Sequence, residues 1–398
     1  MSLFSAVAMA PRDPILGLTE QFVADANPNK VNLGVGVYLD DNGKIPLLAC
    51  VQAAERAMTE KPAPHGYLPI DGLAAYDAGV KALVFGAQSE VVQSARVATV
   101  QALGGTGGLK IGADFLRHLA PQAKVLISNP SWENHRALFT QAGFTVESYR
   151  YYDPATRGLD FAGMLADLKA AAPGTIAVLH ACCHNPTGYD LTPEQWDQVI
   201  AVVKAAGLTP FLDMAYQGFA SGLAEDGATV GKFIAAGLSC LVATSFSKNF
   251  SLYGERVGAL SVVGADKDEA ARILSQLKIM ARTNYSNPPT HGAAIVAAVL
   301  SNPEWRAQWE QELGAMRTRI KTMRQRLADG LKAVGVRQDT AYITRQIGMF
   351  SYSGLSKEQM QRLRGEFGVY GTDAGRLCVA ALNSKNVDYV CQSIAKVM

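Results

Sequence analysis

Four side chains that could take part in a reaction follow strand-like apolar runs of the chain. Asp213 and Tyr216 come at the end of one run, and Lys248 comes at the end of another, between two phenylalanines. An amine that apolar neighbours shield from water has a lowered pKa and can act as a nucleophile. Arg256 follows eight residues later. We interpret the lysine as reactive, and the carboxyl, phenol and guanidinium groups as its partners.

Seven short apolar runs must position these groups, and we predict that each is a buried strand: 97–103, 124–128, 145–151, 175–181, 209–213, 240–246 and 257–263. Helical spacing separates most of them, for example at 193–206, where Thr192 and Gln195 predict a capping box. This alternation predicts an α/β fold with a mostly parallel seven-stranded sheet sandwiched by helices. Ligands of such sheets bind beyond the carboxyl ends of the strands, where the reactive side chains fall.

A glycine-rich segment, GGTGG at 104–108, follows the first run, and we expect a helix to begin after it at Leu109. Glycines let backbone N–H groups approach an anion at a helix N-terminus. The segment matches neither Gly-x-Gly-x-x-Gly nor the Walker pattern. A plain strand-to-helix turn therefore stays an equal alternative to an anion site.

One cofactor would use all of these groups together. Pyridoxal 5′-phosphate needs an amine to hold its aldehyde, a carboxylate to keep its ring nitrogen protonated, and anion-binding groups for its phosphate. We assign the amine to Lys248, the carboxylate to Asp213, and a hydrogen bond to the ring hydroxyl to Tyr216. The phosphate would be bound by Gly105, Thr106, Ser245 and Arg256.

The composition excludes several classes of protein. Of 398 residues, 48% are hydrophobic and 18% are charged, which is typical of a folded globular chain. The 37 basic and 35 acidic side chains leave a charge of +2, and no basic run occurs, so we expect no nucleic-acid partner. The longest apolar stretch, 293–300, is too short for a membrane span. With no secretory signal and six cysteines mostly in apolar runs, we expect a cytoplasmic protein with reduced thiols.

A zinc site is a remote alternative. His180, Cys182 and His184 alternate along an extended run, so all three can face one side and present metal ligands. The spacing lacks the paired ligands of structural zinc sites. In the preferred interpretation the two histidines are hydrogen-bonded around the site, the cysteines pack as small apolar groups, and no metal is bound.

The residue composition and the pattern of the sequence change after residue 302. Long helical stretches rich in Arg, Gln and Glu fill 303–334, and we expect strand-like pieces at 343–351 and 376–381. We predict a large domain over 41–302 and a smaller α+β domain over 303–398. Residues 1–40 are too few to fold alone, so we assign them to an arm and a part of the small domain, packed against the C-terminal part or a neighbouring subunit.

Ordered motifs span nearly the whole chain: DPILGL at 13–18, NLGVGVY at 32–38, YLPIDG at 67–72, GGTG at 104–107, NPSWENH at 129–135, HNPTG at 184–188, SFSKNF at 245–250, RVG at 256–258, and Arg282 with YSNPP at 285–289. In these motifs the chain resembles the class I, fold-type I aminotransferases. It is most similar to the branch of aspartate and aromatic amino acid aminotransferases, and within it to the bacterial aromatic (tyrosine) enzymes.

The resemblance implies a homodimer with shared active sites. In such a dimer Tyr67 and Arg282 enter the site of the partner subunit. Tyr67 would contact the cofactor phosphate, and Arg282 would meet the distal carboxylate of a dicarboxylic substrate. Small-molecule amino acids and 2-oxo acids are the implied ligands.

The resemblance also implies roles within the chain. Trp132 would stack on the cofactor ring, and Asn185 would contact the ring hydroxyl and the substrate carboxylate. Gly36 would line the substrate pocket, and Ser247 belongs with the cofactor-binding residues. Arg376 would bind the substrate α-carboxylate, which a planar guanidinium can hold through two parallel hydrogen bonds.

The implied reaction is transamination, with Lys248, Tyr67 and Asp213 as catalytic residues and 2-oxoglutarate as the usual acceptor. Lys248 would take the α-proton as general base. Leu39 and Ile45 stand where aspartate-selective relatives often carry lysine and threonine. Apolar groups at the rim of the pocket favour an aromatic ring. We therefore predict activity on tyrosine, phenylalanine and aspartate.

Three alternatives remain beside this prediction. The first is an aspartate aminotransferase with little aromatic activity. The second is a binding or regulatory protein that has kept the fold without the activity. The third is another pyridoxal phosphate reaction, because a fold does not determine a reaction. The presence of Tyr67, Arg282 and Arg376 together favours transamination.

Overall fold

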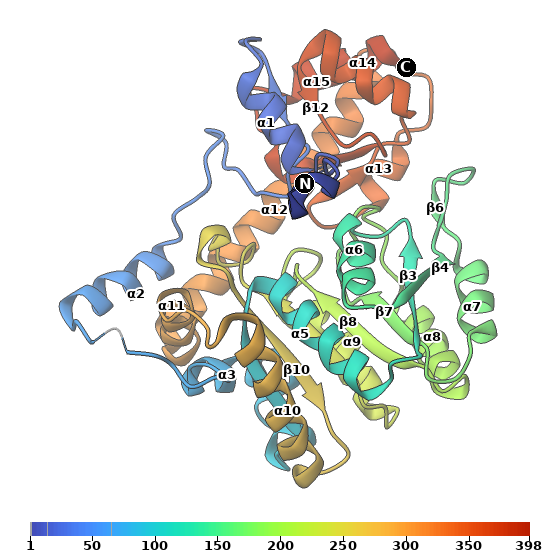
Figure 1. Ribbon diagram of the computed structural model, residues 1–398. Helices are drawn as coiled ribbons and strands as arrows, with labels where there is room; N and C mark the ends of the chain where they lie inside the picture. The colour runs from blue at the N-terminus through green and yellow to red at the C-terminus, as the bar shows by residue number, and fades with distance from the viewer. Residues whose placement is uncertain (1, 14, 65) are drawn as a thin grey trace.

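The computed structural model describes residues 2–13, 15–64 and 66–398. Pro14 of the first motif lies outside the described residues, as do Met1 and His65. A lower part of the molecule is built on a twisted sheet, and the C-terminal elements gather above it beside helix α1 (Leu16–Ala24) (Figure 1). Within the described ranges, no helix is both long and apolar enough to cross a membrane.

The central sheet has seven strands in the order β2-β10-β9-β8-β7-β3-β4. They match the seven predicted runs to within a few residues: β2 (Val97–Leu103), β3 (Lys124–Asn129), β4 (Thr145–Arg150), β7 (Ile176–His180), β8 (Thr209–Met214), β9 (Leu241–Ser245) and β10 (Val257–Val263). Strand β10 runs antiparallel to β2 and β9, and the other pairs are parallel. The prediction of a mostly parallel seven-stranded sheet is confirmed.

Side chains of the strands alternate between two hydrophobic cores. In β10, Val257 and Ala259 belong to one core, and Leu260 and Val262 to the other. Successive Cβ atoms of a strand point to opposite faces, so both faces need cover. One face is covered by α5 (Gly104–Leu119), α6 (Glu133–Gln141) and α10 (Lys267–Tyr285), and the other by α7 (Phe161–Ala170), α8 (Pro193–Ala205), α9 (Leu223–Ala235) and α11 (His291–Ser301).

Two helix starts test the sequence analysis. The capping box of α8 is confirmed, since the Thr192 hydroxyl accepts from the Gln195 N–H and the Gln195 side chain accepts from the Thr192 N–H. The expected start of α5 at Leu109 is wrong, because the helix begins at Gly104. Glycine is a poor helix former, but here it lets the first turns pack directly on the backbone of β10, as Gly108 does against Ala259.

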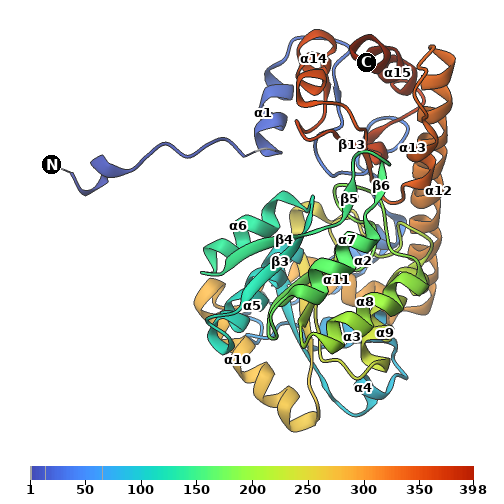
Figure 2. The same ribbon diagram turned by 90° about the vertical axis from the view of Figure 1, so that its right-hand side faces the viewer.

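The C-terminal elements form two small sheets and several helices. Strand β1 (Val31–Asn32) pairs with β12 (Val369–Tyr370), and β11 (Phe350–Tyr352) pairs with β13 (Arg376–Cys378). The long helix α12 (Pro303–Ala333) runs along the side of the molecule from the lower to the upper part (Figure 2). The β1–β12 pair ties the N-terminal segment to the C-terminal part, as expected. The domain limits at residues 40 and 302 stay our proposal.

The strand expected over 343–351 is wrong in its first half. A short helix, α13 (Ala341–Arg345), occupies the start of this range. Only the last residues of the expected strand belong to β11. Tyr342 and Ile343 are both buried in this helix, and the Tyr342 hydroxyl donates to the carbonyl of Ser353 at 2.6 Å. These tertiary contacts override the strand preference of the β-branched residues. Over 376–381, strand β13 is followed by a 3₁₀ turn, Val379–Ala381.

The contact between β10 and α5 gives a first prediction. A Cβ on Gly258 would overlap the backbone of Gly104 and Gly105. We expect Gly258→Ala to push the start of α5 off the sheet and to lower the free energy of unfolding by about 1–3 kcal/mol, the usual cost of overpacking. Denaturant unfolding measures this loss.

The control is Gly231→Ala on α9, where a Cβ meets nothing within 4 Å. This change should raise the free energy of unfolding by about 0.5–1 kcal/mol, because alanine is the better helix former. Equal stability of the two variants would contradict the close packing of α5 on β10.

Candidate active site

A cavity of about 480 Å³ opens at the carboxyl ends of β8 and β9, beneath the C-terminal elements. Most of the predicted site residues line it: Gly36, Gly105, Thr106, Trp132, Asn185, Asp213, Tyr216, Ser245, Ser247, Lys248, Arg256 and Arg376. Tyr67 and Arg282 do not line it. Both are exposed, Tyr67 to 95%. The chain thus brings together all of the predicted residues except the two assigned to a partner subunit.

Asp213, near the end of β8, places a carboxylate in the wall of this cavity. It is 5% exposed, and its Oδ2 accepts a hydrogen bond from His135 Nε2 at 2.8 Å. An ionised carboxylate only accepts, so Nε2 of His135 donates this bond, and Nδ1 of the same ring lies 2.9 Å from the Ser131 hydroxyl oxygen. Burial raises the pKa of Asp213, but the hydrogen bond and the electrostatic attraction of His135 outweigh it and lower the pKa overall, with a smaller contribution from Lys248.

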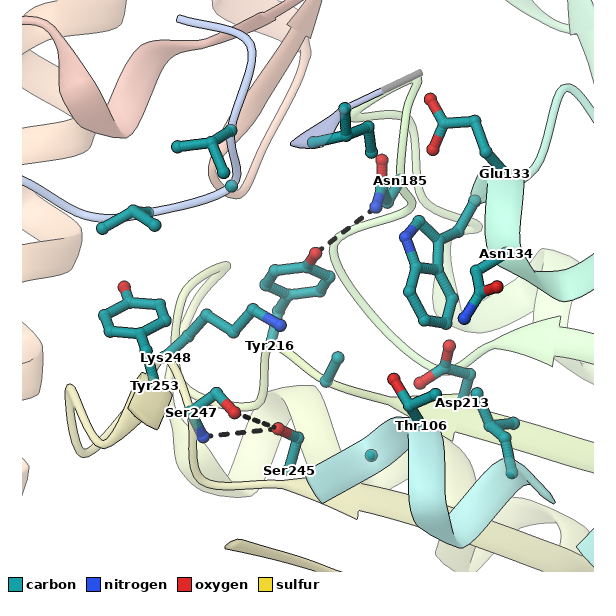
Figure 3. Close-up of a pocket in the computed structure, with 18 of the residues that line it drawn as sticks. Thr106, Glu133, Asn134, Asn185, Asp213, Tyr216, Ser245, Ser247, Lys248 and Tyr253 are labelled. Carbon is teal, nitrogen blue, oxygen red and sulfur yellow. Dashed lines mark hydrogen bonds between the residues drawn. The ribbon is translucent and has the colours of Figure 1, made fainter. Parts of the chain in front are cut away.

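Lys248 follows β9 and extends into the same cavity between Tyr253 and Tyr216 (Figure 3). Its Nζ lies 5.1 Å from the centroid of the Tyr216 ring. Desolvation lowers the pKa of Lys248 to about 8, against the opposing attraction of Asp213. A substantial fraction of the amine is therefore neutral near physiological pH and available as a nucleophile or base.

A group of anion-binding donors gathers at the start of α5. Arg256 has a left-handed φ of 54°, and its Nη1 donates to the Tyr253 carbonyl at 2.9 Å and to the Ser247 hydroxyl at 3.4 Å. The Ser247 N–H donates to the Ser245 hydroxyl at 3.3 Å. A Cβ on Gly104 would lie 2.5 Å from Nη2 of Arg256, so the glycine makes room for the guanidinium. Hydroxyl, guanidinium and helix N–H groups together suit a phosphate.

A second guanidinium faces the cavity from β13. Arg376 is 1% exposed, and it donates to the Asn185 Oδ1 at 2.9 Å and to the Gly34 carbonyl at 2.7 Å. Its Cζ lies 4.5 Å from the centroid of the Phe350 ring. Asn185 in turn donates to the Tyr216 hydroxyl at 3.4 Å (Figure 3). A buried guanidinium with neutral hydrogen-bond acceptors is suited to bind a carboxylate.

Three residues without a predicted role also lie at the site. His135 holds Asp213, Phe350 packs under Arg376, and Tyr253 accepts from the Tyr38 N–H at 2.9 Å. His135 lies within the NPSWENH motif, which was the available signal. Phe350 carried no signal, because its contacts come from segments distant in the sequence.

The zinc alternative is not supported. In the described residues, the potential metal cluster that holds His180 contains neither Cys182 nor His184, and the cluster that holds Cys182 contains neither histidine. His184 is hydrogen-bonded as expected, to the Ser128 and Thr187 hydroxyls at 2.8 Å each. For His180 the expectation is wrong, since neither ring nitrogen makes a hydrogen bond among the described residues and the buried Nε2 has no partner. Burial lowers the pKa of His180 to about 3, so the ring is neutral.

The two residues on which the aromatic preference was based lie beside this cavity. Leu39 and Ile45 line a neighbouring hollow of about 710 Å³, which shares Val35 and Val37 with the main cavity. In one chain Leu39 and Ile45 therefore do not line the main cavity itself.

The family of the chain follows from comparison with known proteins. The model of the family "Aminotransferase class I and II" matches residues 28–394. The chain belongs to this family, and it is an enzyme of the aminotransferase class.

Individual relatives cover the whole chain. It is 60% identical to the aspartate aminotransferase of Pseudomonas aeruginosa and 49% identical to the aromatic-amino-acid aminotransferase of Escherichia coli, in both cases over 100% of each chain. The solved structure of the aromatic-amino-acid aminotransferase of Burkholderia pseudomallei, covalently bound to pyridoxal phosphate, is 63% identical with a TM-score of 0.97 and full coverage of both chains. The fold prediction is thereby confirmed.

The environment of Lys248 predicts a pH dependence. Because its pKa is lowered to about 8, the amine should react with formaldehyde and borohydride with a midpoint near pH 8 in the cofactor-free protein. Exposed lysines should show a midpoint near about 10.4. Mass spectrometry of the labelled peptides measures both in one experiment.

Asp213→Asn provides a check on the cause. The Asp213 charge raises the pKa of Lys248, so its removal should move the midpoint to still lower pH. A Lys248 midpoint equal to that of the exposed lysines would contradict the desolvated site.

Proposed function

We propose that the protein transfers the amino group of tyrosine, phenylalanine and aspartate to 2-oxoglutarate, with pyridoxal 5′-phosphate as cofactor. The products are the corresponding 2-oxo acids and glutamate. The observation that carries this proposal is the pairing of Lys248 and Asp213 with Arg376 in one cavity. The first two groups suit the cofactor, and the third suits the α-carboxylate that all of the substrates share.

The residues present fit the cofactor. Lys248 would hold the aldehyde, Asp213 the ring nitrogen, and Tyr216 and Asn185 the ring hydroxyl, with Trp132 stacked on the ring. The phosphate would be bound by donors at the start of α5: Gly105, Thr106, Ser245, Ser247 and Arg256. Gly104 leaves room for the guanidinium of Arg256, because a Cβ there would overlap it.

Residues of this chain would carry out the proton transfers and the substrate binding of the proposed reaction. When bound, pyridoxal phosphate supplies an electron sink for the charge left at the α-carbon. Asp213, ionised because its pKa is lowered, keeps a proton on the ring nitrogen. Lys248, whose amine lies in the same cavity, would hold the cofactor aldehyde and would act as the general base that takes up and later gives back the substrate proton. Arg376 orients the substrate through its carboxylate.

Two features support the proposed substrate range: the apolar lining of the cavity and the arginine that a partner subunit would supply. Ile15, Leu16, Val37 and Phe350 give it an apolar lining that suits a phenyl or phenol ring. A distal carboxylate would be bound by Arg282 of the partner subunit. The relative at 60% identity is named an aspartate aminotransferase, which favours a second candidate with little aromatic activity. The solved structure at 63% identity is named an aromatic-amino-acid aminotransferase.

We further propose a homodimer with shared sites. Tyr67 and Arg282 are exposed in the single chain, although the resemblance assigns both to an active site. The two lie on connected segments, since Asn287 donates to the carbonyl of Leu68 at 2.9 Å. One surface can thus present both residues to a second copy of the chain.

We propose the cytoplasm as the location of the protein. The six cysteines, all free and buried, support this proposal, because thiols stay reduced in that compartment.

The test of the reaction is the absorbance spectrum of the cofactor-loaded enzyme with single amino donors. L-tyrosine, L-phenylalanine and L-aspartate should each convert the band of the lysine-bound cofactor to that of its amine form. Conversion by aspartate alone would support the second candidate. Lys248→Ala should retain the cofactor and lose turnover by at least about 10³-fold, because it lacks both nucleophile and base. Turnover by this variant at the native rate would contradict the assignment.

Shared sites predict complementation between two defective chains. Co-expressed Lys248→Ala and Arg282→Ala chains form mixed dimers in which one site has both residues intact. Aspartate transamination should recover to about a quarter of the wild-type rate, because about half of random dimers are mixed and each has one intact site. Each variant alone should stay far below this rate. Failure to recover, with mixed dimers present by mass spectrometry, would contradict shared sites.

A further inference from the structure

Glu133, the first residue of α6, places a second carboxylate beside the substrate arginine. It lines the main cavity, and its Oε2 lies 3.7 Å from Nη1 of Arg376. This distance exceeds a hydrogen bond, and in the described chain Oε2 is shielded from solvent without a hydrogen-bond partner. Figure 3 shows the side chain beside Asn185, which accepts from the same nitrogen. The carboxylate therefore faces the guanidinium without a hydrogen bond to it.

The guanidinium is also incompletely satisfied. Among the described residues, the guanidinium of Arg376 donates to the neutral oxygens of Asn185 and Gly34, and its Nε has no hydrogen-bond partner. Its side chain is 1% exposed, so water screens its charge weakly. Glu133 is the carboxylate that the described chain places within 4 Å of this charge. It compensates the charge for as long as no substrate is bound.

We propose that Glu133 is a built-in competitor of the substrate α-carboxylate at Arg376 and thereby sets the affinity for every substrate. This inference rests on the proposed function. A substrate carboxylate must approach to hydrogen-bond distance of the guanidinium, where it meets the Glu133 carboxylate as a like charge. The Glu133 side chain is 31% exposed, so it can turn towards water when the substrate enters.

The competition weakens all substrates alike. Aromatic and dicarboxylic amino acids present the same α-carboxylate to Arg376 and differ only at the distal end. Because Glu133 faces Arg376, its effect should appear in binding and be equal for the two classes. A change in substrate binding that is kept in the transition state alters KM and leaves kcat in place.

The test compares Glu133→Gln with the wild-type holoenzyme. Glutamine keeps the length of the side chain and removes its charge. The KM for tyrosine and the KM for aspartate should both fall by about three- to fivefold, the scale of a partly exposed ion pair, and kcat should stay within about twofold. The dissociation constant of 3-phenylpropionate, a carboxylate without an amine, should fall by the same factor in calorimetry. Glu133→Ala should act in the same direction.

Glu366→Gln is the matched control, because this carboxylate pairs with Arg362 on the surface of α14 (Lys357–Phe367). It should leave the three constants unchanged. An unchanged or raised KM in Glu133→Gln would overturn the proposal, and a fall for aspartate alone would place the action of Glu133 at the distal carboxylate instead. If the wild-type enzyme converted none of the donors, the proposed function would fail, and 3-phenylpropionate binding would still test the competition at Arg376.

Discussion

The buried negative charge of Asp213 is the interaction on which the rest of the site depends. A carboxylate at 5% exposure is costly unless it is hydrogen-bonded and compensated. His135 provides the hydrogen bond and the larger electrostatic attraction, and the charge of Lys248 adds a smaller one. The bond to His135 also ties the first turn of α6 to the end of β8, and with it the neighbouring Trp132. The charge of Asp213 also raises the pKa of Lys248 and so opposes the effect of desolvation on that amine.

The reversed direction of β10 brings Arg256 to the same edge of the sheet as Lys248. In a fully parallel sheet, a residue preceding a strand lies at the edge opposite the ligand. Because β10 is antiparallel to its neighbours, Arg256, directly before it, reaches the same edge as Lys248 after β9. The carbonyl of Arg256 accepts from the Gly104 N–H at 2.9 Å, and this bond holds the arginine to the first turn of α5.

The substrate end of the cavity is assembled from segments far apart in the chain. Gly34 lies near one end of the sequence and Arg376 near the other, yet they share a hydrogen bond of 2.7 Å. Phe350 supports the guanidinium from β11, and the buried Arg324 of α12 donates to the Phe350 carbonyl at 2.8 Å. Arg376 is therefore held by the C-terminal elements, while Lys248 and Asp213 are held by the central sheet.

Local pattern in the sequence determined the seven strands, the capping box at Thr192 and the desolvated position of Lys248. Apolar periodicity, side-chain capping and shielding by near neighbours all act over a few residues. Ordered motifs extended this to the site residues Asn185 and Arg376. Tertiary structure alone decided the start of α5 at Gly104 and the helix at Tyr342, where packing overrides local preference. It also decided the partners of Asp213 and Arg376. These partners lie on segments that are far apart along the chain, and no local sequence pattern indicates that they are in contact.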